Sequence, residues 1–129
     1  MSAGKTQKIL VVDDSKLIHK MYEVMLRPHL LIYAFNGQEG LQKLAEHPDI
    51  DLVILDINMP QINGLEFLSY AKATPAFAKI PVCVVSTEGK DEDILRGLNA
   101  GAAAYIKKPF QREQLVHVIE RMQGGESAA

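Results

Sequence analysis

Five short apolar runs, none of which alternates with polar residues, constrain the fold more than any other feature of this sequence. They occupy residues 9–12, 30–35, 52–55, 82–85 and, most weakly, 104–106. Continuous runs of Val, Ile and Leu are typical of strands covered on both faces, as in a parallel sheet. Longer segments with the apolar spacing of helices separate the runs. We therefore expect five strands that alternate with five helices.

Local signals place the ends of several of these helices. The segment 15–27 has one apolar face, and Pro28 is expected to end it. Residues 36–39 and 63–66 both have the Asn-x-x-Glu pattern of a capping box, in which the two side chains satisfy free N–H groups of the first turn. The fourth and fifth helices are expected at about 91–99 and 111–122.

The alternation predicts a three-layer α/β domain with right-handed crossovers. The chain has 129 residues, which is too short for a (β/α)₈ barrel. A flavodoxin-like (βα)₅ fold with the strand order 2-1-3-4-5 is the natural choice. In that order the first and third strands flank the switch point where ligands bind, outside the carboxyl ends of the strands. We expect one domain over residues 1–123 and a flexible tail or linker stub at 124–129.

Composition excludes several classes of function. The formal net charge of −2 argues against bulk binding of nucleic acid or of an acidic membrane. Cys83 is the single cysteine, which excludes a disulfide framework and is most simply a buried small hydrophobic residue. No apolar run approaches the ~20 residues of a membrane span, and residues 1–8 lack the apolar stretch of a signal peptide. We therefore expect a cytoplasmic protein.

Polar side chains follow all five apolar runs at the predicted carboxyl edge of the sheet. Asn36 follows the second run, and the residues that follow the other four are Asp13, Asp14, Asp56, Ser86 and Lys108. Three neighbouring carboxylates repel one another unless a cation lies between them. Hard oxygen ligands without a His or Cys set favour Mg²⁺. Mg²⁺ and a lysine beside a carboxylate are also what phosphoryl transfer requires, with the carboxylate as a possible nucleophile.

These residues belong to motifs that resemble the receiver domain of two-component response regulators, most closely the single-domain chemotaxis type. The motifs are Val-Val-Asp-Asp at 11–14, Leu-Asp-Ile-Asn-Met-Pro at 55–60, Val-Ser-Thr at 85–87 and Lys-Lys-Pro-Phe at 107–110. Each motif alone is weak, but four in order at the family's spacing are highly specific. The resemblance covers about residues 8–122 and implies the receiver form of the fold.

The resemblance implies a role for each matching residue. Asp56 is the expected phosphoacceptor, and Mg²⁺ is expected to bind Asp14, Asp56, the backbone carbonyl of Asn58 and, through water, Asp13. Ser86 is expected to hydrogen-bond the phosphoryl group and Lys108 to pair with it. Thr87 follows directly, but Ser86 has the family's spacing from Lys108. The expected donor is a phosphohistidine on a sensor kinase or phosphotransfer protein, or a small molecule such as acetyl phosphate.

The same resemblance indicates how a signal ends and how it leaves the site. Asn58 and Glu88 match positions that modulate loss of the phosphoryl group, so we expect a short-lived signal. Ser86 is expected to move toward the phosphoryl group, and Tyr105 to fill the space it leaves. The fourth helix is expected to respond because Gly97 weakens it and only Ile94, Leu95 and Leu98 can anchor it.

The expected partner face consists of the fourth helix, the fifth strand and the fifth helix. On the fifth helix, Val116 and Val118 are read as lying off the apolar stripe of Leu115, Ile119 and Met122, and are expected to be exposed. We expect a downstream protein target there, no nucleic-acid partner, and either a monomer or a phosphorylation-dependent dimer. The dispersed histidines are expected at the surface or at strand edges; they are His19, His29, His47 and His117.

Three other functions compete with a phosphorylation-controlled signalling module that is not a classical enzyme. A pseudo-receiver would act without phosphorylation, but its usual mark is loss of an acid, the acceptor or the lysine, and all are present. A hydrolase of the haloacid dehalogenase type would carry a second Asp where this chain has Asn58, and a cap domain does not fit. A nucleotide-binding protein would carry a glycine-rich loop where residues 13–16 stand.

Overall fold

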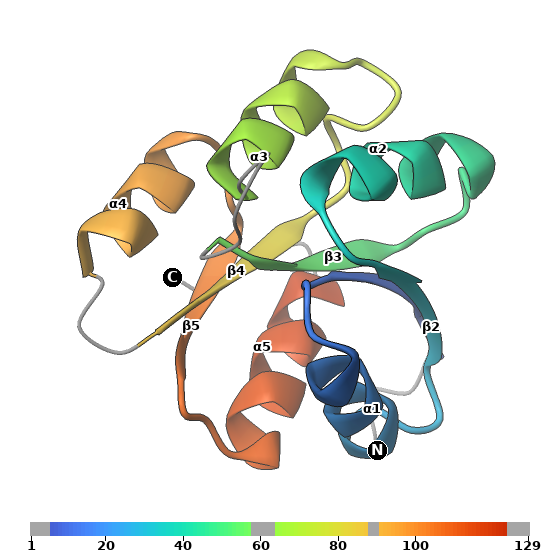
Figure 1. Cartoon of the computed structure of the whole chain (residues 1–129), viewed down its shortest axis with the longest axis vertical. Coiled ribbons are helices and arrows are strands. Elements are labelled where there is room, and N and C mark those ends of the chain that lie inside the picture. Colours follow the sequence, from blue (N-terminus) through green and yellow to red (C-terminus); the bar gives the residue numbers. More distant parts are fainter. Residues whose placement is uncertain (1–5, 58–63, 88–90, 124–129) are drawn as a thin grey trace.

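The computed structural model describes residues 6–57, 64–87 and 91–123. Five parallel strands form one sheet in the order β2-β1-β3-β4-β5, which is the predicted order (Figure 1). The strands are β1 (Lys8–Val12), β2 (Leu30–Ala34), β3 (Leu52–Asp56), β4 (Val82–Thr87) and β5 (Ala104–Lys108). The helices are α1 (Lys16–Met25), α2 (Gly37–Glu46), α3 (Gly64–Ala73), α4 (Asp91–Asn99) and α5 (Arg112–Gln123). The flavodoxin-like prediction is confirmed.

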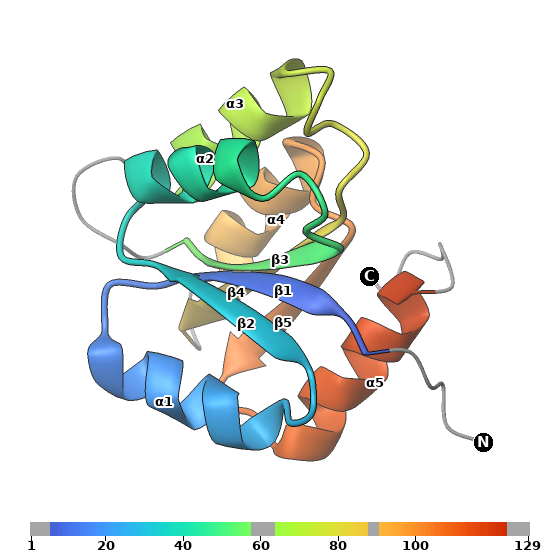
Figure 2. The ribbon, with the colours of Figure 1, turned by 90° about the vertical axis from the view of Figure 1, so that its right-hand side faces the viewer.

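The helices cover both faces of the sheet, so that the strands form the middle of three layers. α1 and α5 lie on one face, and α2, α3 and α4 lie on the other (Figure 1, Figure 2). Successive β1 side chains enter opposite cores: Ile9 and Val11 face α1 and α5, whereas Leu10 and Val12 face α2 and α3. This double burial explains why the strands are apolar without alternation.

Three strands extend further at their carboxyl ends than the apolar runs, whereas β2 ends at Ala34, one residue before the end of its run. β3 includes Asp56, β4 includes Ser86 and Thr87, and β5 includes Lys107 and Lys108. The polar residues therefore belong to the ladder itself, and strand pairing fixes their backbones.

α1 ends earlier than the proline signal predicts. Its N-cap is Ser15, whose hydroxyl accepts a hydrogen bond from the Ile18 N–H at 3.2 Å. Its last helical residue is Met25, and a turn at residues 26–28 follows, so the prediction of a helix to residue 27 is wrong. The reason is that the residue before a proline is disfavoured in helical conformation.

The predicted capping box at α2 forms with one difference. The Asn36 side chain accepts a hydrogen bond from the Glu39 N–H at 2.8 Å, as expected. The Glu39 carboxylate, however, accepts from the N–H of Phe35, at 2.8 Å, rather than from that of Asn36. The other predicted box starts at Asn63, which lies outside the described residues.

α4 occupies the predicted residues but is anchored differently. Ile94 is buried, whereas Leu95 is 60% exposed, so the prediction of Leu95 as an anchor is wrong. Gly97 faces the sheet, where an added Cβ would lie 3.2 Å from a methyl of Val84. The helix ends in a Schellman motif, with the Ala102 N–H donating to Gly97 O at 3.0 Å and Gly101 at a φ of 113°. Gly97 thus serves close packing as well as weakening the helix.

Two expectations about exposure are wrong. Val118 is only 8% exposed because it lies three residues after Leu115 and four before Met122, on the same buried face of α5. His19 is also buried, with its ring centroid 4.7 Å from that of Tyr33 and 4.6 Å from that of Phe35. Cys83 is buried as predicted, and burial raises the pKa of its thiol to about 12. Within the described residues, the helices are too short or too polar to cross a membrane.

Candidate phosphoacceptor site

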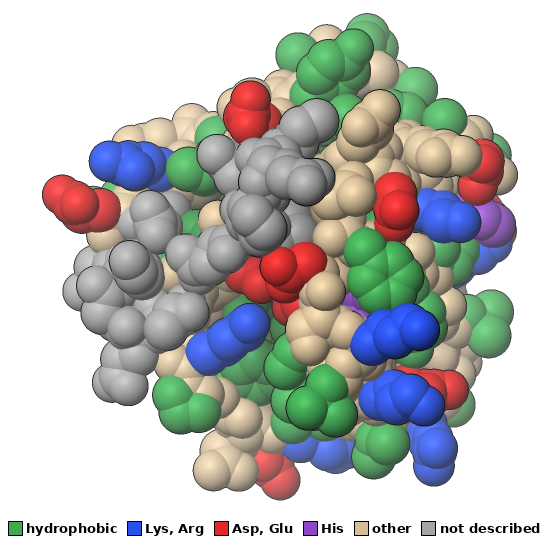
Figure 3. Space-filling view, viewed as in Figure 1, with side chains coloured by type: hydrophobic (Ala, Val, Ile, Leu, Met, Phe, Trp, Pro, Cys, Tyr) green, Lys and Arg blue, Asp and Glu red, His purple; other side chains and the backbone are tan. Residues whose placement is uncertain are grey.

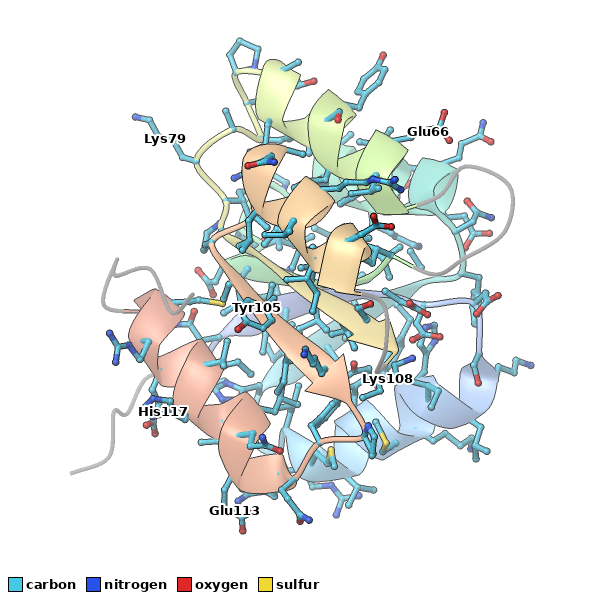
Figure 4. All side chains as sticks on the ribbon, turned by 90° about the vertical axis from the view of Figure 1, so that its left-hand side faces the viewer. Glu66, Lys79, Tyr105, Lys108, Glu113 and His117 are labelled. Atoms are coloured by element: carbon cyan, nitrogen blue, oxygen red, sulfur yellow. The ribbon has the colours of Figure 1, made fainter. Side chains whose placement is uncertain are left out.

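The predicted site residues come together at the carboxyl ends of four strands. Asp13 and Asp14 directly follow β1, and Asp56 ends the neighbouring β3. Ser86 lies near the end of β4, and Lys108 ends β5. Figure 3 shows acidic side chains near the middle of the face drawn there, and Figure 4 shows Lys108 at the end of β5. The strand order alone brings these residues to one edge.

The three carboxylates are close enough to share one cation. One oxygen from each of Asp13, Asp14 and Asp56 lies within 4.8 Å of the others. Asp13 is 2% exposed and Asp56 is 6% exposed, whereas Asp14 faces solvent. Lys108 Nζ lies 3.8 Å from Asp13 Oδ2 and 3.7 Å from Asp56 Oδ2. The amine is therefore between two acids and in hydrogen-bonding contact with neither of these oxygens.

The Asp13 carboxylate is held in an unfavourable environment. Its Oδ1 accepts a hydrogen bond from the Ser15 N–H at 2.9 Å, but its buried Oδ2 has no hydrogen-bond partner among the described residues. Burial and, to a lesser extent, the charge of Asp56 raise the pKa of Asp13 to about 6, against the opposing effect of the hydrogen bond from the Ser15 N–H. A buried anionic oxygen without a hydrogen bond, in a set of hard oxygen donors, fits a Mg²⁺ ligand.

Ser86 lies inside the sheet beside the acceptor strand. It is fully buried, and it is paired in register with Lys107, while its neighbour Val85 is paired with Asp56. Tyr105 lies three residues before Lys108 on β5, is exposed and is in register with Val84 (Figure 4). The side chain of Thr87 is not described. Ser86 therefore stands one residue beyond the acceptor pairing, on the strand between Asp56 and Lys108.

The comparisons with known proteins agree with this geometry. The family model of the response regulator receiver domain matches residues 9–120. The chain belongs to this family.

Similar proteins extend over nearly the whole receiver. A chemotaxis protein CheY homolog of Campylobacter jejuni is 34% identical over 128 residues, which cover 95% of this chain and 98% of the relative. The structure of chemotaxis protein CheY4 of Vibrio cholerae matches with a TM-score of 0.82 at 30% identity, covering 91% of this chain and 98% of that one. The phosphorylated cyanobacterial phytochrome response regulator RcpA matches with a TM-score of 0.77 at 28% identity, covering 92% of each chain.

Membership gives the receiver a general function. Receiver domains of CheY-like response regulators are phosphorylation-dependent signalling modules rather than classical enzymes, and they bind Mg²⁺ at an acidic pocket. The described Asp cluster stands where this pocket is expected. Asn58 and Glu88 lie outside the described residues. On the expected partner face, Val116 is half-buried and Val118 belongs to the core, so Val118 is corrected from an exposed docking residue to a packing residue.

Two contacts that the sequence patterns do not predict support the segment after Lys108. Phe110 stacks on Tyr22 with ring centroids 6.2 Å apart, and the Arg112 Nε–H donates to Met25 O at 2.9 Å. Together they attach the segment after β5 to α1. The Phe110 motif residue is visible in the sequence, but its partner lies 88 positions away, and no local pattern identifies it.

Proposed function

We propose that this receiver accepts a phosphoryl group on the Asp56 carboxylate from a phosphohistidine of a sensor kinase or phosphotransfer protein. Acetyl phosphate is a simpler donor of the same group. The observation that carries the proposal is the position of Asp56: its carboxylate is 3.7 Å from Lys108 Nζ and belongs to a cluster with Asp13 and Asp14. A nucleophile, a fixed cation and metal-binding acids are the parts that phosphoryl transfer needs.

In the transfer, one Asp56 oxygen forms a bond to phosphorus while the bond from phosphorus to the donor nitrogen breaks. The imidazole leaves with the electron pair of that bond and takes up a proton. Lys108 offsets negative charge on the phosphoryl oxygens, and the Ser86 hydroxyl donates a hydrogen bond to one of them. The product is an acyl phosphate on Asp56.

The acids have a separate task. Asp14 and Asp56 would bind Mg²⁺ directly, Asp13 would bind it through water, and the backbone carbonyl of Asn58 would complete the protein ligands. Bound Mg²⁺ would supply positive charge to the transferring group and relieve the repulsion among the carboxylates. Asn58 and Glu88 are proposed to set how fast the acyl phosphate hydrolyses. A phosphorylated half-life of many hours would contradict that role.

The proposed output is a change at the face formed by α4, β5 and α5. Movement of Ser86 toward the phosphoryl group vacates space that Tyr105 can fill, and α4 responds. The exposed Leu95 on α4 and the exposed Tyr105 on β5 are apolar groups that a downstream protein could cover. A coupling of about 1–3 kcal/mol changes partner affinity roughly five- to 150-fold.

Intact-mass spectrometry after incubation with acetyl phosphate and Mg²⁺ tests the proposal. We expect one added phosphoryl group, which is absent in Asp56→Asn and in EDTA. Asp51→Asn is a matched control, because Asp51 directly precedes the opposite end of β3 and is exposed. Labelling of Asp56→Asn at the wild-type level would exclude Asp56 as the acceptor.

The alternative is a pseudo-receiver that binds a partner without phosphorylation. A wild-type chain that neither takes up phosphate nor binds Mg²⁺ would favour it. If the chain does take up phosphate, sedimentation of the phosphorylated and unphosphorylated forms distinguishes a constant monomer from a phosphorylation-dependent dimer.

A further inference from the structure

The first residue of α3 touches the backbone of the proposed phosphoacceptor. Gly64 is buried and lies on the same helix face as Phe67, Leu68 and Ala71, which are the buried residues of α3. A Cβ added at Gly64 would lie 2.6 Å from Ile57 Cα and 2.8 Å from the carbonyl oxygen of Asp56. Both distances are shorter than real contacts allow, so only glycine permits this approach.

Close approach, and not backbone conformation, is what requires glycine here. Gly101 has a φ of 113°, but Gly64 has no such left-handed conformation. The atoms that a Gly64 side chain would meet belong mostly to backbone at the end of a central strand, and backbone there cannot rotate aside. α3 itself is fixed by the fully buried Phe67 and Leu68. A side chain at Gly64 would therefore push the helix and the Asp56 peptide apart.

The Asp56–Ile57 peptide is held from its other side by β4. The Ile57 N–H donates to Val85 O at 3.2 Å, while the Asp56 carbonyl oxygen faces Gly64. The peptide thus lies between a strand and a helix. The Asp56 side chain, which leaves the same backbone, reaches the cluster with Asp13 and Asp14 and the amine of Lys108.

We propose that Gly64 is a positioning residue for the acceptor: its bare backbone seats α3 on the Asp56–Ile57 peptide and so sets where the Asp56 carboxylate stands relative to the other acids. This inference rests on the proposed function, because it assigns to Gly64 a part in metal binding and phosphoryl uptake. Mg²⁺ demands near-ideal octahedral geometry, and reacting groups lose rate steeply when misplaced by about an ångström. A displaced Asp56 should therefore weaken both.

Gly64→Ala tests the proposal, and Gly40→Ala is its matched control. A Cβ at Gly40 would lie 2.8 Å from a ring carbon of Phe67 and 3.1 Å from a methyl of Val12, so it also crowds the core, though less closely, and it meets side chains rather than the acceptor backbone. Both variants are first checked for folding by urea titration. Mg²⁺ affinity is then measured by calorimetry without a phosphodonor, and phosphoryl uptake is measured by mass spectrometry with acetyl phosphate and Mg²⁺.

We expect Gly64→Ala to weaken Mg²⁺ binding and to slow phosphoryl uptake by about tenfold or more, while Gly40→Ala stays within about twofold of wild type on both. The backbone carbonyl ¹³C shift of Asp56 in the metal-free chain should change only in Gly64→Ala. Equal losses in the two variants would show a merely structural role and overturn the proposal. Wild-type Mg²⁺ affinity in folded Gly64→Ala would also overturn it.

Two results separate this inference from the proposed function. A wild-type chain that binds Mg²⁺ but takes up no phosphate counts against the proposed function alone, because the metal titration still compares Gly64→Ala with Gly40→Ala. If Gly64→Ala does not fold, amide exchange on the wild-type chain decides. A seated α3 predicts that Mg²⁺ protects the amides of Phe67 and Leu68 together with that of Ile57, and protection of Ile57 alone would contradict it.

Discussion

The two edges of the sheet carry similar charged residues but satisfy them differently. At the amino edge, Lys8 Nζ lies 2.9 Å from both carboxylate oxygens of Asp49, and the Lys8 N–H donates to Asp51 at 2.8 Å. At the carboxyl edge, Lys108 Nζ stays 3.7 Å and 3.8 Å from the oxygens of Asp56 and Asp13.

The acid pKa values follow this difference. The hydrogen bond from Lys8 lowers the pKa of the exposed Asp49, whereas burial raises the pKa of Asp13 to about 6. At the amino edge, Lys8 and Asp49 form a fully hydrogen-bonded ion pair at the surface. The carboxyl edge holds buried charge that the described protein groups only partly satisfy, which is the arrangement typical of a functional site. Four experiments can break or sharpen this contrast.

Removal of each edge's lysine should give the largest contrast. Lys108→Ala should slow phosphoryl uptake from acetyl phosphate by about 100-fold, because it removes the fixed positive charge beside the acceptor. Lys8→Ala makes the same change in net charge at the far edge and should leave the rate within about twofold. Stopped incubations analysed by intact mass give both rates. Equal slowing in the two variants would mean that overall charge, and not position, controls uptake.

Asp13→Asn should stabilise the metal-free chain. A carboxyl whose pKa is raised on folding binds more protons in the folded state, so its contribution to stability falls as pH rises from about 4 to about 6 and stays lost at pH 7. Replacement by the neutral amide should recover about 1–2 kcal/mol of unfolding free energy at pH 7 and almost none at pH 4. Urea titrations at both pH values in EDTA measure it. A gain that does not depend on pH would point to packing instead of charge.

Mg²⁺ should offset the loss of stability that the buried Asp13 charge causes in the wild-type chain. At about ten times its dissociation constant, a ligand that binds only the folded state adds about 1.4 kcal/mol to the unfolding free energy. Asp13→Asn, which weakens the site, should gain less, and Asp49→Asn should gain as much as wild type. NaCl at equal ionic strength controls for screening. Equal stabilisation by NaCl would show that the effect is not binding at the carboxyl edge.

The fold and most of the site could be predicted because both depend on local signals and one geometric rule. Apolar runs marked the strands, and the carboxyl ends of parallel strands meet at one edge, so Asp56 and Lys108 were predictable neighbours despite their separation in sequence. The observed register of β3, β4 and β5 places the polar residues at the ends of these strands next to one another, as the pattern predicts.

The failures involve side chains whose surroundings come from distant segments. His19 is buried because Tyr33 of β2 stacks on it and Phe35, the residue after β2, packs against it at a tilt; no local pattern around His19 predicts these contacts. Val118 is buried, contrary to the prediction, because the apolar stripe of α5 includes it as well as Leu115, Ile119 and Met122. The sequence places Gly64 inside a predicted capping box, and only the folded chain shows that it faces the Asp56 carbonyl. The periodicity of apolar residues can be recognised in the sequence, but the distance between two packed segments cannot.

The smallest effect on stability should come from the surface ion pair of Lys8 and Asp49. Asp49→Asn removes the partner of Lys8, and because that pair is exposed we expect only a slight loss of stability, which disappears in ~1 M NaCl, where the screening length is about 3 Å. The gain in Asp13→Asn should persist in the same salt, because Asp13 is buried and ions cannot screen it well. Urea titrations of both variants at low and high salt make the comparison. If salt erased both effects equally, the carboxyl edge would be as open to solvent as the amino edge, and its acids would have no special need of a bound cation.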